Sequence, residues 1–483
     1  MSGKYRRILS LWLLFLAFGI LGAAGASIGA WALSSSSDTV AVSTPAPTAP
    51  STAEGRIRQI QSAEADLSWT ARVVSLGGLF VLLGLCWLMS NNRRKINWSL
   101  VAWGTALQLL FAILVLKTSP GLWVFERLND LVNALLGFTQ EGTEFLFRSM
   151  SSGRMESPML NFAFTVLPTI IFFSSLMTVL YHVGIMPWIV KAFAVAMRKT
   201  MKTSGAETLS TSANIFVGQT EAPLVVKPYI EKMTMSELMA VMVGGFANTA
   251  GGVLAAYVGL LRDSFPDIAG HLIAQSVMSA PAALVCAKIV FPETERPETH
   301  GEFHMTMEKV DSNAIDAAAR GAAEGLKLAL NVAAMLLAFI ALIAMLNGGL
   351  KLAGTWFGCG AVSLERIFGF AFWPLAWVMG VPTPDCTLVA QWLGTKTVLN
   401  EFVAYLDMAQ YLNGGSPIHY RSVVIASYAL SGFANFSSIA IQIGGISGIA
   451  PSRRHDLAKI GLKAMFVGAI ATFTTATIAG LLI

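Results

Sequence analysis

The tetrapeptide Gly245-Phe246-Ala247-Asn248 occurs a second time as Gly432-Phe433-Ala434-Asn435. Each copy lies in the middle of a long apolar run, at about residues 239–261 and 423–449. A glycine at such a point permits a membrane helix to unwind, and the freed backbone groups must then be satisfied by a ligand, an ion or the protein itself. Close packing of helices on small residues is the alternative. The repeat predicts two interrupted helices in corresponding positions of two halves.

A polar segment precedes each interrupted run. Residues 206–230 and about 370–405 are only patchily apolar, and they carry Glu221 and Glu401 in mid-segment. Irregular backbone at membrane depth is tolerated only where it lines protein or a water-filled cavity, so re-entrant hairpins fit better than straight spans. Because both halves show a hairpin followed by an interrupted helix, we expect an internal duplication in the form of inverted repeats.

The composition excludes a soluble protein of this size. Hydrophobic residues make up 54% and charged residues 13% of 483 residues, against about 25% charged residues in a typical soluble domain. The net charge of +5 comes from short Lys and Arg clusters between apolar runs, which is typical of membrane topology signals rather than of nucleic-acid binding. Cysteines and histidines show no metal-binding spacing, so we expect no cofactor. The predicted fold class is an all-α membrane protein.

The N-terminal region is set apart from the rest. Basic residues precede an apolar run that ends near residue 33. This run is longer than the ~7–15 residues of a signal-peptide core, which favours an uncleaved membrane anchor at 1–33 over a cleavable signal peptide. Residues 34–68 are rich in Ser, Thr, Pro and Ala, a composition typical of a flexible linker.

Further elements complete the predicted organisation. An amphipathic pattern at 122–138 indicates a helix in the membrane interface or half-buried against the bundle, and Thr234 with Glu237 predicts a capping box. Other spans are expected at 69–89, 98–116, 160–183, 273–291, 326–352 and 457–483. The predicted domains are 69–205 (N-terminal spans and interfacial helix, a scaffold), 206–291 (first hairpin, broken helix and next span), 292–325 (polar connector), 326–369 (scaffold helix), 370–450 (second hairpin and broken helix) and 451–483 (C-terminal span).

The acidic hairpin residues are the strongest functional candidates. A carboxylate at hydrocarbon depth costs about 2.5–3.5 kcal/mol on insertion scales, so it is expected to serve a function unless the position is really a loop. Lys227 and Lys396 flank the hairpin tips, where we expect their stems to reach the interface. The predicted polar lining holds no arginine and consists of Gln219, Thr220, Glu221, Glu401, Asn435 and Ser438. These groups suit a small neutral polyhydroxylated solute that travels with a cation.

At these residues the sequence resembles the concentrative nucleoside transporter family. The resemblance runs from about residue 71 to 483 and is carried by ANIFVGQTEAP (213–223), MTMSELMAVMVGGFANTAGGVL (233–254), GLKLALNVAAMLLAFIAL (325–342), VLNEFVAYLD (398–407) and GFANFSSIAIQIGG (432–445). It implies an eight-helix transporter core with two re-entrant hairpins and two interrupted helices, plus the extra N-terminal helix. It also implies a homotrimer in membrane lipid that imports nucleosides across the inner or plasma membrane by elevator-like alternating access.

The resemblance also assigns roles to individual residues. Gln219 and Thr220 would contact the nucleobase, with Glu221 assisting partly through water. Val253 and Phe433 would supply apolar contacts. Glu401, Asn435 and Ser438 would hold the ribose hydroxyls.

For the coupling cation, the resemblance implies the Asn214 side chain and the Val217 carbonyl, then the Asn248 side chain and the Thr249 carbonyl. This chain departs from the family at Asn248, where we expect Ser or Thr. Na⁺ is the favoured ion and H⁺ the rival. An uncoupled facilitator is a further alternative. An enzyme that uses Glu221 and Glu401 as an acid/base pair is the alternative from another class, and it needs the two carboxyls about 5–10 Å apart.

Overall fold

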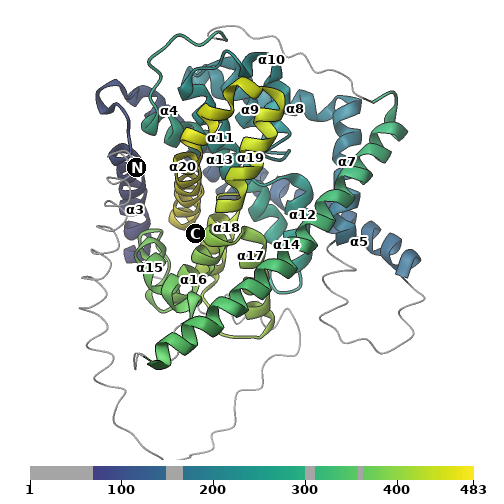
Figure 1. Cartoon of the computed structure of the whole chain (residues 1–483), viewed down its shortest axis with the longest axis vertical. Helices are drawn as coiled ribbons and strands as arrows, with labels where there is room; N and C mark the ends of the chain where they lie inside the picture. The colour runs from purple at the N-terminus through teal and green to yellow at the C-terminus, as the bar shows by residue number, and fades with distance from the viewer. Residues whose placement is uncertain (1–68, 148–166, 300–310, 357–362) are drawn as a thin grey trace, which may run out of the picture.

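The computed structural model describes residues 69–147, 167–299, 311–356 and 363–483, and the regular elements in these ranges are all helices (Figure 1). The predicted anchor at 1–33 and linker at 34–68 lie outside the described residues. Among the described residues, five helices are long and apolar enough to cross a membrane. A sixth span results if α7 (Leu167–Val183) and α8 (Ile185–Met201), which are bent by 76° relative to each other, count as one.

The N-terminal helices follow the predicted spans closely. α3 (Trp69–Leu88) and α4 (Trp98–Lys117) are joined by a 3-10 turn at Arg93–Lys95. The amphipathic helix α5 (Ser119–Phe147) is longer than expected. α8 was not predicted as a separate helix. Its buried residues recur at helical spacing and are Met186, Val190, Ala194, Met197 and Met201.

The first hairpin and the first broken helix are confirmed as elements. The hairpin consists of α9 (Gly205–Ala213), a 3-10 turn (Ala222–Val226) and the short α10 (Lys227–Ile230). The interrupted helix consists of α11 (Met235–Ala247) and α12 (Gly251–Leu261). The predicted capping box of Thr234 and Glu237 opens α11, and Ser204 with Glu207 forms an equivalent box at α9.

The second half repeats this order. α15 (Leu364–Val378) and a 3-10 turn (Thr383–Asp385) precede α16 (Cys386–Val398) and α17 (Glu401–Asn413). The hairpin turn lies at Leu399–Asn400, so its second arm extends further than the predicted range. The interrupted helix consists of α18 (Tyr420–Leu430) and α19 (Phe436–Ile449). A 3-10 turn (Pro451–Arg453) leads into α20 (Arg454–Leu482).

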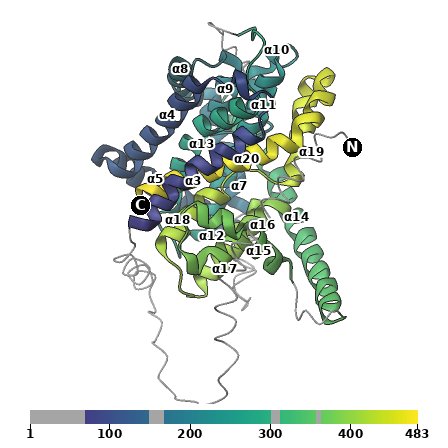
Figure 2. The same cartoon turned by 90° about the vertical axis from the view of Figure 1, so that its left-hand side faces the viewer.

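Two long helices connect these parts. α13 (Ile268–Val290) matches its predicted span, whereas α14 (Ala314–Trp356) begins well before the expected residue 326. The polar stretch at its start is rich in alanine, which has the highest helix propensity, so the helix extends into the region predicted as a connector. α14 packs against α7 and runs along the outside of the bundle in both views (Figures 1 and 2).

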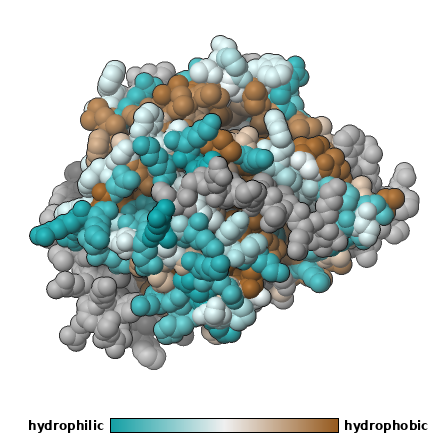
Figure 3. All heavy atoms as spheres, turned by 90° about the horizontal axis from the view of Figure 1, so that it is seen from above, coloured by the Kyte–Doolittle hydropathy of each residue, from teal (hydrophilic) through white to brown (hydrophobic). Residues whose placement is uncertain are grey.

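The two hairpins lie toward opposite ends of the molecule. The first hairpin lies at the top of Figures 1 and 2, with α11, and the second hairpin lies at the bottom, with α18. The interrupted helices therefore run in opposite directions. α20 packs against α11, α13 and α18, while α3 and α4 cover α13 and α20 from outside. Seen from the end that carries α10, hydrophilic residues cover much of the centre and the left and lower parts of the face, and hydrophobic residues are densest along the upper edge of the view (Figure 3).

The two breaks cross at Gly432. Its φ of +95° lies in the left-handed region that favours glycine. A Cβ there would lie 2.8 Å from the carbonyl oxygens of Phe246 and Ala247, which is too close for any other residue. One glycine of the repeated tetrapeptide thus allows the backbones of the two broken helices to touch.

Candidate functional site

A buried hydrogen-bond network joins the two breaks. The backbone N–H of Gly432 donates to Thr249 Oγ1 (2.9 Å), and the hydroxyls of Thr249 and Ser431 share a hydrogen bond (2.7 Å). Ser431 Oγ donates to Gln275 Oε1 (2.7 Å), and Gln275 Nε2 donates to the carbonyl of Ala247 (3.2 Å). Because a buried polar group without a partner is costly, this network holds the freed backbone of both breaks in one arrangement.

Glu401 lies beside this crossing and is only 6% exposed. Asn435 Nδ2 donates to Glu401 Oε2 (2.8 Å), and the Tyr257 hydroxyl donates to Glu401 Oε1 (3.2 Å). The carboxylate belongs to the first turn of α17, where the helix dipole favours negative charge. Asn435 also caps α19 by accepting from the N–H of Ser438 (2.9 Å). The carboxylate therefore ties the second hairpin to both broken helices.

The first hairpin tip reaches the same place from the other end. Gln219 Nε2 donates to Ser438 Oγ (3.3 Å), so Gln219, Ser438, Asn435 and Glu401 form one connected set. Glu221 behaves differently because it is exposed, and its Oε2 accepts from the N–H of Gly218 in its own tip (2.6 Å).

The remaining predicted contact residues border this set. Thr220 packs against Gly445 of α19, where a Cβ would lie 2.7 Å from Thr220 Cγ2. Val253 is buried in the first turn of α12, and Phe433 is buried within the second break.

The four predicted cation ligands lie on the tip and on the first break. Asn214 ends α9, next to Gly244, and among the described residues its Nδ2 has no hydrogen-bond partner. Asn248 Nδ2 donates to the carbonyl of Gly244 (3.0 Å), and Asn248 Oδ1 accepts from the Ser279 hydroxyl. The N–H of Gly251 donates to the carbonyl of Phe216 (3.1 Å), which ties the break to the tip.

This donor set has the chemistry of an alkali-cation site. Amide and carbonyl oxygens are the ligands that hard cations prefer. Asn214 would bind a cation only through Oδ1, because its unpartnered Nδ2 is a hydrogen-bond donor. The residues therefore fit Na⁺. Val217 and Thr249 would contribute backbone carbonyls, which needs no particular side chain at either position.

Comparison with known proteins shows the family of this chain. Residues 77–150 match the model of the Na⁺ dependent nucleoside transporter N-terminus and residues 271–480 that of its C-terminus. Residues 163–264 match the nucleoside recognition (Gate) model. The chain is 45% identical over 412 residues to an uncharacterized transporter of Haemophilus influenzae, which covers 85% of this chain and 97% of that protein. The chain belongs to the Na⁺-dependent nucleoside transporter family.

The chain is also similar to named solute carriers and nucleoside cotransporters and to solved transporter structures. Solute carrier family 28 member 3 of Rattus norvegicus is 41% identical, and human sodium/nucleoside cotransporter 1 is 40% identical. Each match covers 85% of this chain but only 59% and 64% of those longer proteins. CNTnw in an inward-facing substrate-bound state superposes with a TM-score of 0.79 at 42% identity, over 85% of this chain and 98% of that one. This multi-pass membrane protein is thus a transporter, and the enzyme alternative is rejected.

The transporter contains a buried lysine whose location was predicted wrongly from the sequence. Lys396 was expected to reach the interface, but it is fully buried. Its Nζ donates to the carbonyls of Ala429 (2.7 Å) and Ser431 (3.2 Å) and to Thr472 Oγ1 (3.3 Å). The break in the second interrupted helix frees these carbonyls at the end of α18. They accept hydrogen bonds from the lysine amine, so the amine does not need to reach the membrane interface. Lys227 is exposed, as expected.

A second buried charge cluster supports the base of the first hairpin. Lys288 Nζ lies 2.7 Å from Glu207 Oε2 and donates to Ser236 Oγ (2.8 Å). Ser204 Oγ donates to Glu237 Oε1 (2.6 Å), which links the two capping boxes. This cluster was not predicted from the sequence. The repeated capping-box spacing was its only local signal.

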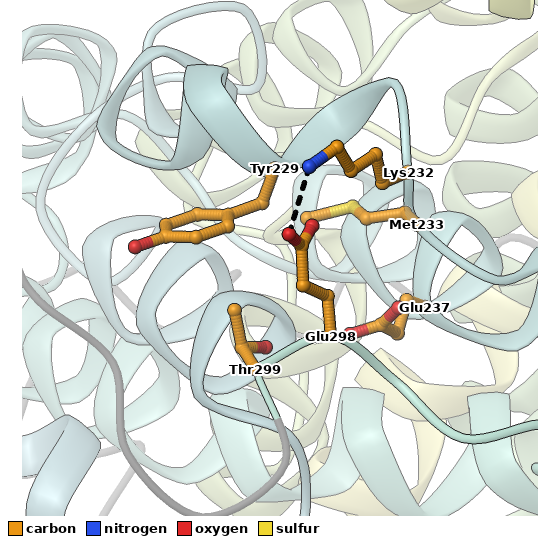
Figure 4. A pocket seen from close by; sticks show the side chains of 6 residues that line it. All are labelled: Tyr229, Lys232, Met233, Glu237, Glu298 and Thr299. Carbon is orange, nitrogen blue, oxygen red and sulfur yellow. Dashed lines mark hydrogen bonds and ion pairs between the residues drawn. The ribbon is translucent and has the colours of Figure 1, made fainter.

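A pocket lies near this cluster, away from the predicted site (Figure 4). Its lining includes Tyr229, Met233 and Thr299, and Lys232 faces Glu298 across it with 2.9 Å between Nζ and Oε1. The Glu298 carboxylate raises the pKa of the Lys232 amine above its ordinary value. None of the predicted substrate or cation residues lines this pocket, so we assign it no role in transport.

Proposed function

We propose that this transporter imports nucleosides across the inner or plasma membrane by symport with Na⁺. The connected set of Gln219, Ser438, Asn435 and Glu401 carries the proposal, because it joins a hairpin tip of one half to a hairpin and broken helix of the other. A site assembled from both halves at a crossing of interrupted helices is the arrangement expected of a secondary transporter.

The chemistry of the site suits a nucleoside. The Glu401 carboxylate accepts two hydrogen bonds from protein groups and retains lone pairs that would accept from ribose hydroxyls. The helix N-termini at Glu401 and Asn435 add donors and a favourable dipole. Gln219 and Thr220 would contact the base, with Glu221 assisting, and buried Val253 and Phe433 would supply apolar contacts.

The coupling ion would be held by Asn214, Val217, Asn248 and Thr249. The family supports Na⁺, and these residues offer amide and carbonyl oxygens. Proton coupling is the second candidate, since Asn248 Oδ1 already accepts from Ser279 and Asn248 Nδ2 is engaged by Gly244. An ion at this position must share the Asn248 oxygen with that hydroxyl.

Alternating access would be elevator-like, within a homotrimer embedded in lipid. α7 and α14 pack against each other at the outside of the bundle, which suits a fixed part of the transporter. The hairpins and broken helices are tied together by the buried networks, which suits a unit that moves as one. The eight-helix count and the domain boundaries at 69–205, 206–291, 292–325, 326–369, 370–450 and 451–483 remain predictions from the sequence.

Uptake into proteoliposomes tests the proposal directly. Purified protein is reconstituted, and entry of radiolabelled uridine and adenosine is measured with an inward Na⁺ gradient, with an inward proton gradient, and with choline in both compartments. We expect accumulation above equilibrium with the Na⁺ gradient alone. Accumulation driven only by protons would replace the ion, and equal uptake in all three conditions would indicate a facilitator. No uptake of either nucleoside would reject the proposed substrate class.

A further inference from the structure

A chain of hydrogen bonds runs behind Gln219. The side chain of Gln442 on α19 is fully buried and lies between Gln219 and the backbone of α11. Gln442 Nε2 donates to the carbonyl of Met242 (3.1 Å) and to Gln219 Oε1 (3.1 Å). Gln219 Nε2 donates in turn to Ser438 Oγ (3.3 Å). Two amides from different halves of the chain thus connect a backbone carbonyl to the substrate site.

The direction of this chain is fixed at one end. The Met242 carbonyl can only accept, so the nitrogen of the Gln442 amide must face it. The second N–H of that nitrogen points to Gln219, which must therefore present its oxygen to Gln442 and its nitrogen to Ser438. Gln442 Oε1 has no partner among the described residues. The two donated bonds, and not the acceptor, therefore orient this amide.

Two glycines lie where the space around these side chains is too small for a further Cβ. A Cβ on Gly245 would lie 2.6 Å from Gln442 Nε2 and 3.0 Å from Gln219 Cβ. On α19, a Cβ on Gly445 would lie 2.7 Å from Thr220 Cγ2. The tip that carries Gln219 is therefore enclosed between α11 and α19, and the absence of a side chain at Gly245 leaves room for the two amides to meet.

We propose that Gln442 is a positioning residue that sets the hydrogen-bond polarity of the substrate site through Gln219. This inference rests on the proposed function. With the amide of Gln219 fixed, its N–H side faces the site. Ser438, which accepts from Gln219, donates its own proton onward to the substrate. The base contact then favours a nucleobase that presents a carbonyl oxygen, as uracil does at position 4, over one that presents an amino group there, as cytosine does.

The test compares uridine with cytidine, which present a carbonyl oxygen and an amino group at position 4 and, correspondingly, a donor and an acceptor at N3. Gln442→Met keeps the length of the side chain but removes its donors, so the amide of Gln219 can turn over. Uridine and cytidine are tested as competitors of radiolabelled uridine uptake, and the ratio of their inhibition constants is measured. We expect the preference for uridine to fall about three- to tenfold, the factor that corresponds to one hydrogen bond.

Gln108→Met is the matched control. Gln108 is also buried, and its Nε2 donates to Thr475 Oγ1 (3.0 Å) between α4 and α20. This variant loses a buried amide hydrogen bond of the same kind outside the site, so its uridine-to-cytidine ratio should equal that of the wild type. Gln442→Glu provides a test of sign. A carboxylate can only accept, so it turns the Gln219 amide over, and the preference should shift toward cytidine.

Failure of this inference and failure of the proposed function give different results. An unchanged ratio in Gln442→Met, or an equal loss of affinity for both nucleosides, overturns the inference. If a variant does not transport, the shift of its unfolding temperature by each nucleoside in detergent gives the same ratio. Failure of the wild type to take up any nucleoside would reject the proposed function instead, before any variant is compared.

Discussion

The two halves of the transporter follow the same order of elements but satisfy their broken helices differently. At the first break, the freed groups are held by neutral amides and hydroxyls, as in the bonds from Gln275 to Ala247 and from Asn248 to Gly244. At the second break, the ammonium of Lys396 caps the carbonyls of Ala429 and Ser431. One break is thus capped by a buried lysine and the other by amide and hydroxyl groups.

The hairpin carboxylates differ in the same way. Glu401 is buried and receives donors from Tyr257 and Asn435 on other elements, whereas Glu221 is exposed and accepts from its own tip. The buried lysine of the first half, Lys288, lies at the base of the hairpin and pairs with Glu207, whereas Lys396 lies at the second break itself. The first break provides amide and carbonyl oxygens, which suit an exchangeable ion. Three substitutions examine this contrast, in order of expected effect.

Removal of the buried Lys396 amine should have the largest effect. In Lys396→Met, three buried acceptors lose their donor, and each unsatisfied group costs about 1–3 kcal/mol. We expect the unfolding free energy to fall by about 3 kcal/mol or more, with loss of transport. Thermal unfolding of the purified protein in detergent measures this. The control is Lys191→Met on α8, which removes an exposed lysine and should be near neutral. A stable and active Lys396→Met variant would remove the distinction between the two breaks.

This lysine also shows where sequence reasoning reaches its limit. The apolar runs, the repeated tetrapeptide and the capping box at Thr234 are local patterns, and they predicted both broken helices and the start of α11. The position of Lys396 depends on acceptors that α18 and α20 contribute. No local pattern separates a lysine that reaches the interface from one that caps a broken helix, because the stem is the same in both cases.

The site residues also divide into those that a local pattern predicts and those that depend on a distant neighbour. Glu401, Asn435, Ser438 and Gln219 were predicted from their polarity at membrane depth, and the structure connects them. Tyr257 and Gln442 were missed because tyrosine or glutamine in an apolar helix is uninformative without knowledge of its neighbour. The separate helix α8 was missed because its sharp bend depends on a left-handed Gly184 (φ +91°) between two apolar segments.

Neutralising the buried carboxylate should have the second largest effect. Glu401→Gln leaves one of the donors from Tyr257 and Asn435 without its acceptor and weakens the acceptor for ribose. Since hydrogen bonds to charged groups contribute about 1.5–3 kcal/mol, we expect uridine affinity to fall about 10- to 150-fold. Competition of unlabelled uridine against labelled uridine measures it. Glu221→Gln is the matched change on the other hairpin and should cost only a few-fold. Equal losses in the two variants would contradict the contrast between the carboxylates.

The smallest effect is expected at the first break. Asn248→Ser removes the amide nitrogen that donates to Gly244 and places a hydroxyl where the family resemblance implies one. If this side chain ligates Na⁺, transport should remain, and the Na⁺ concentration for half-maximal uptake should fall about two- to fivefold, a difference below 1.4 kcal/mol. Ser279→Ala should act in the same direction, because it frees the lone pair of Asn248 Oδ1 that the Ser279 hydroxyl uses. If both variants keep the Na⁺ dependence of the wild type, Asn248 is a brace between α11 and α13, and the ion is held elsewhere or replaced by a proton.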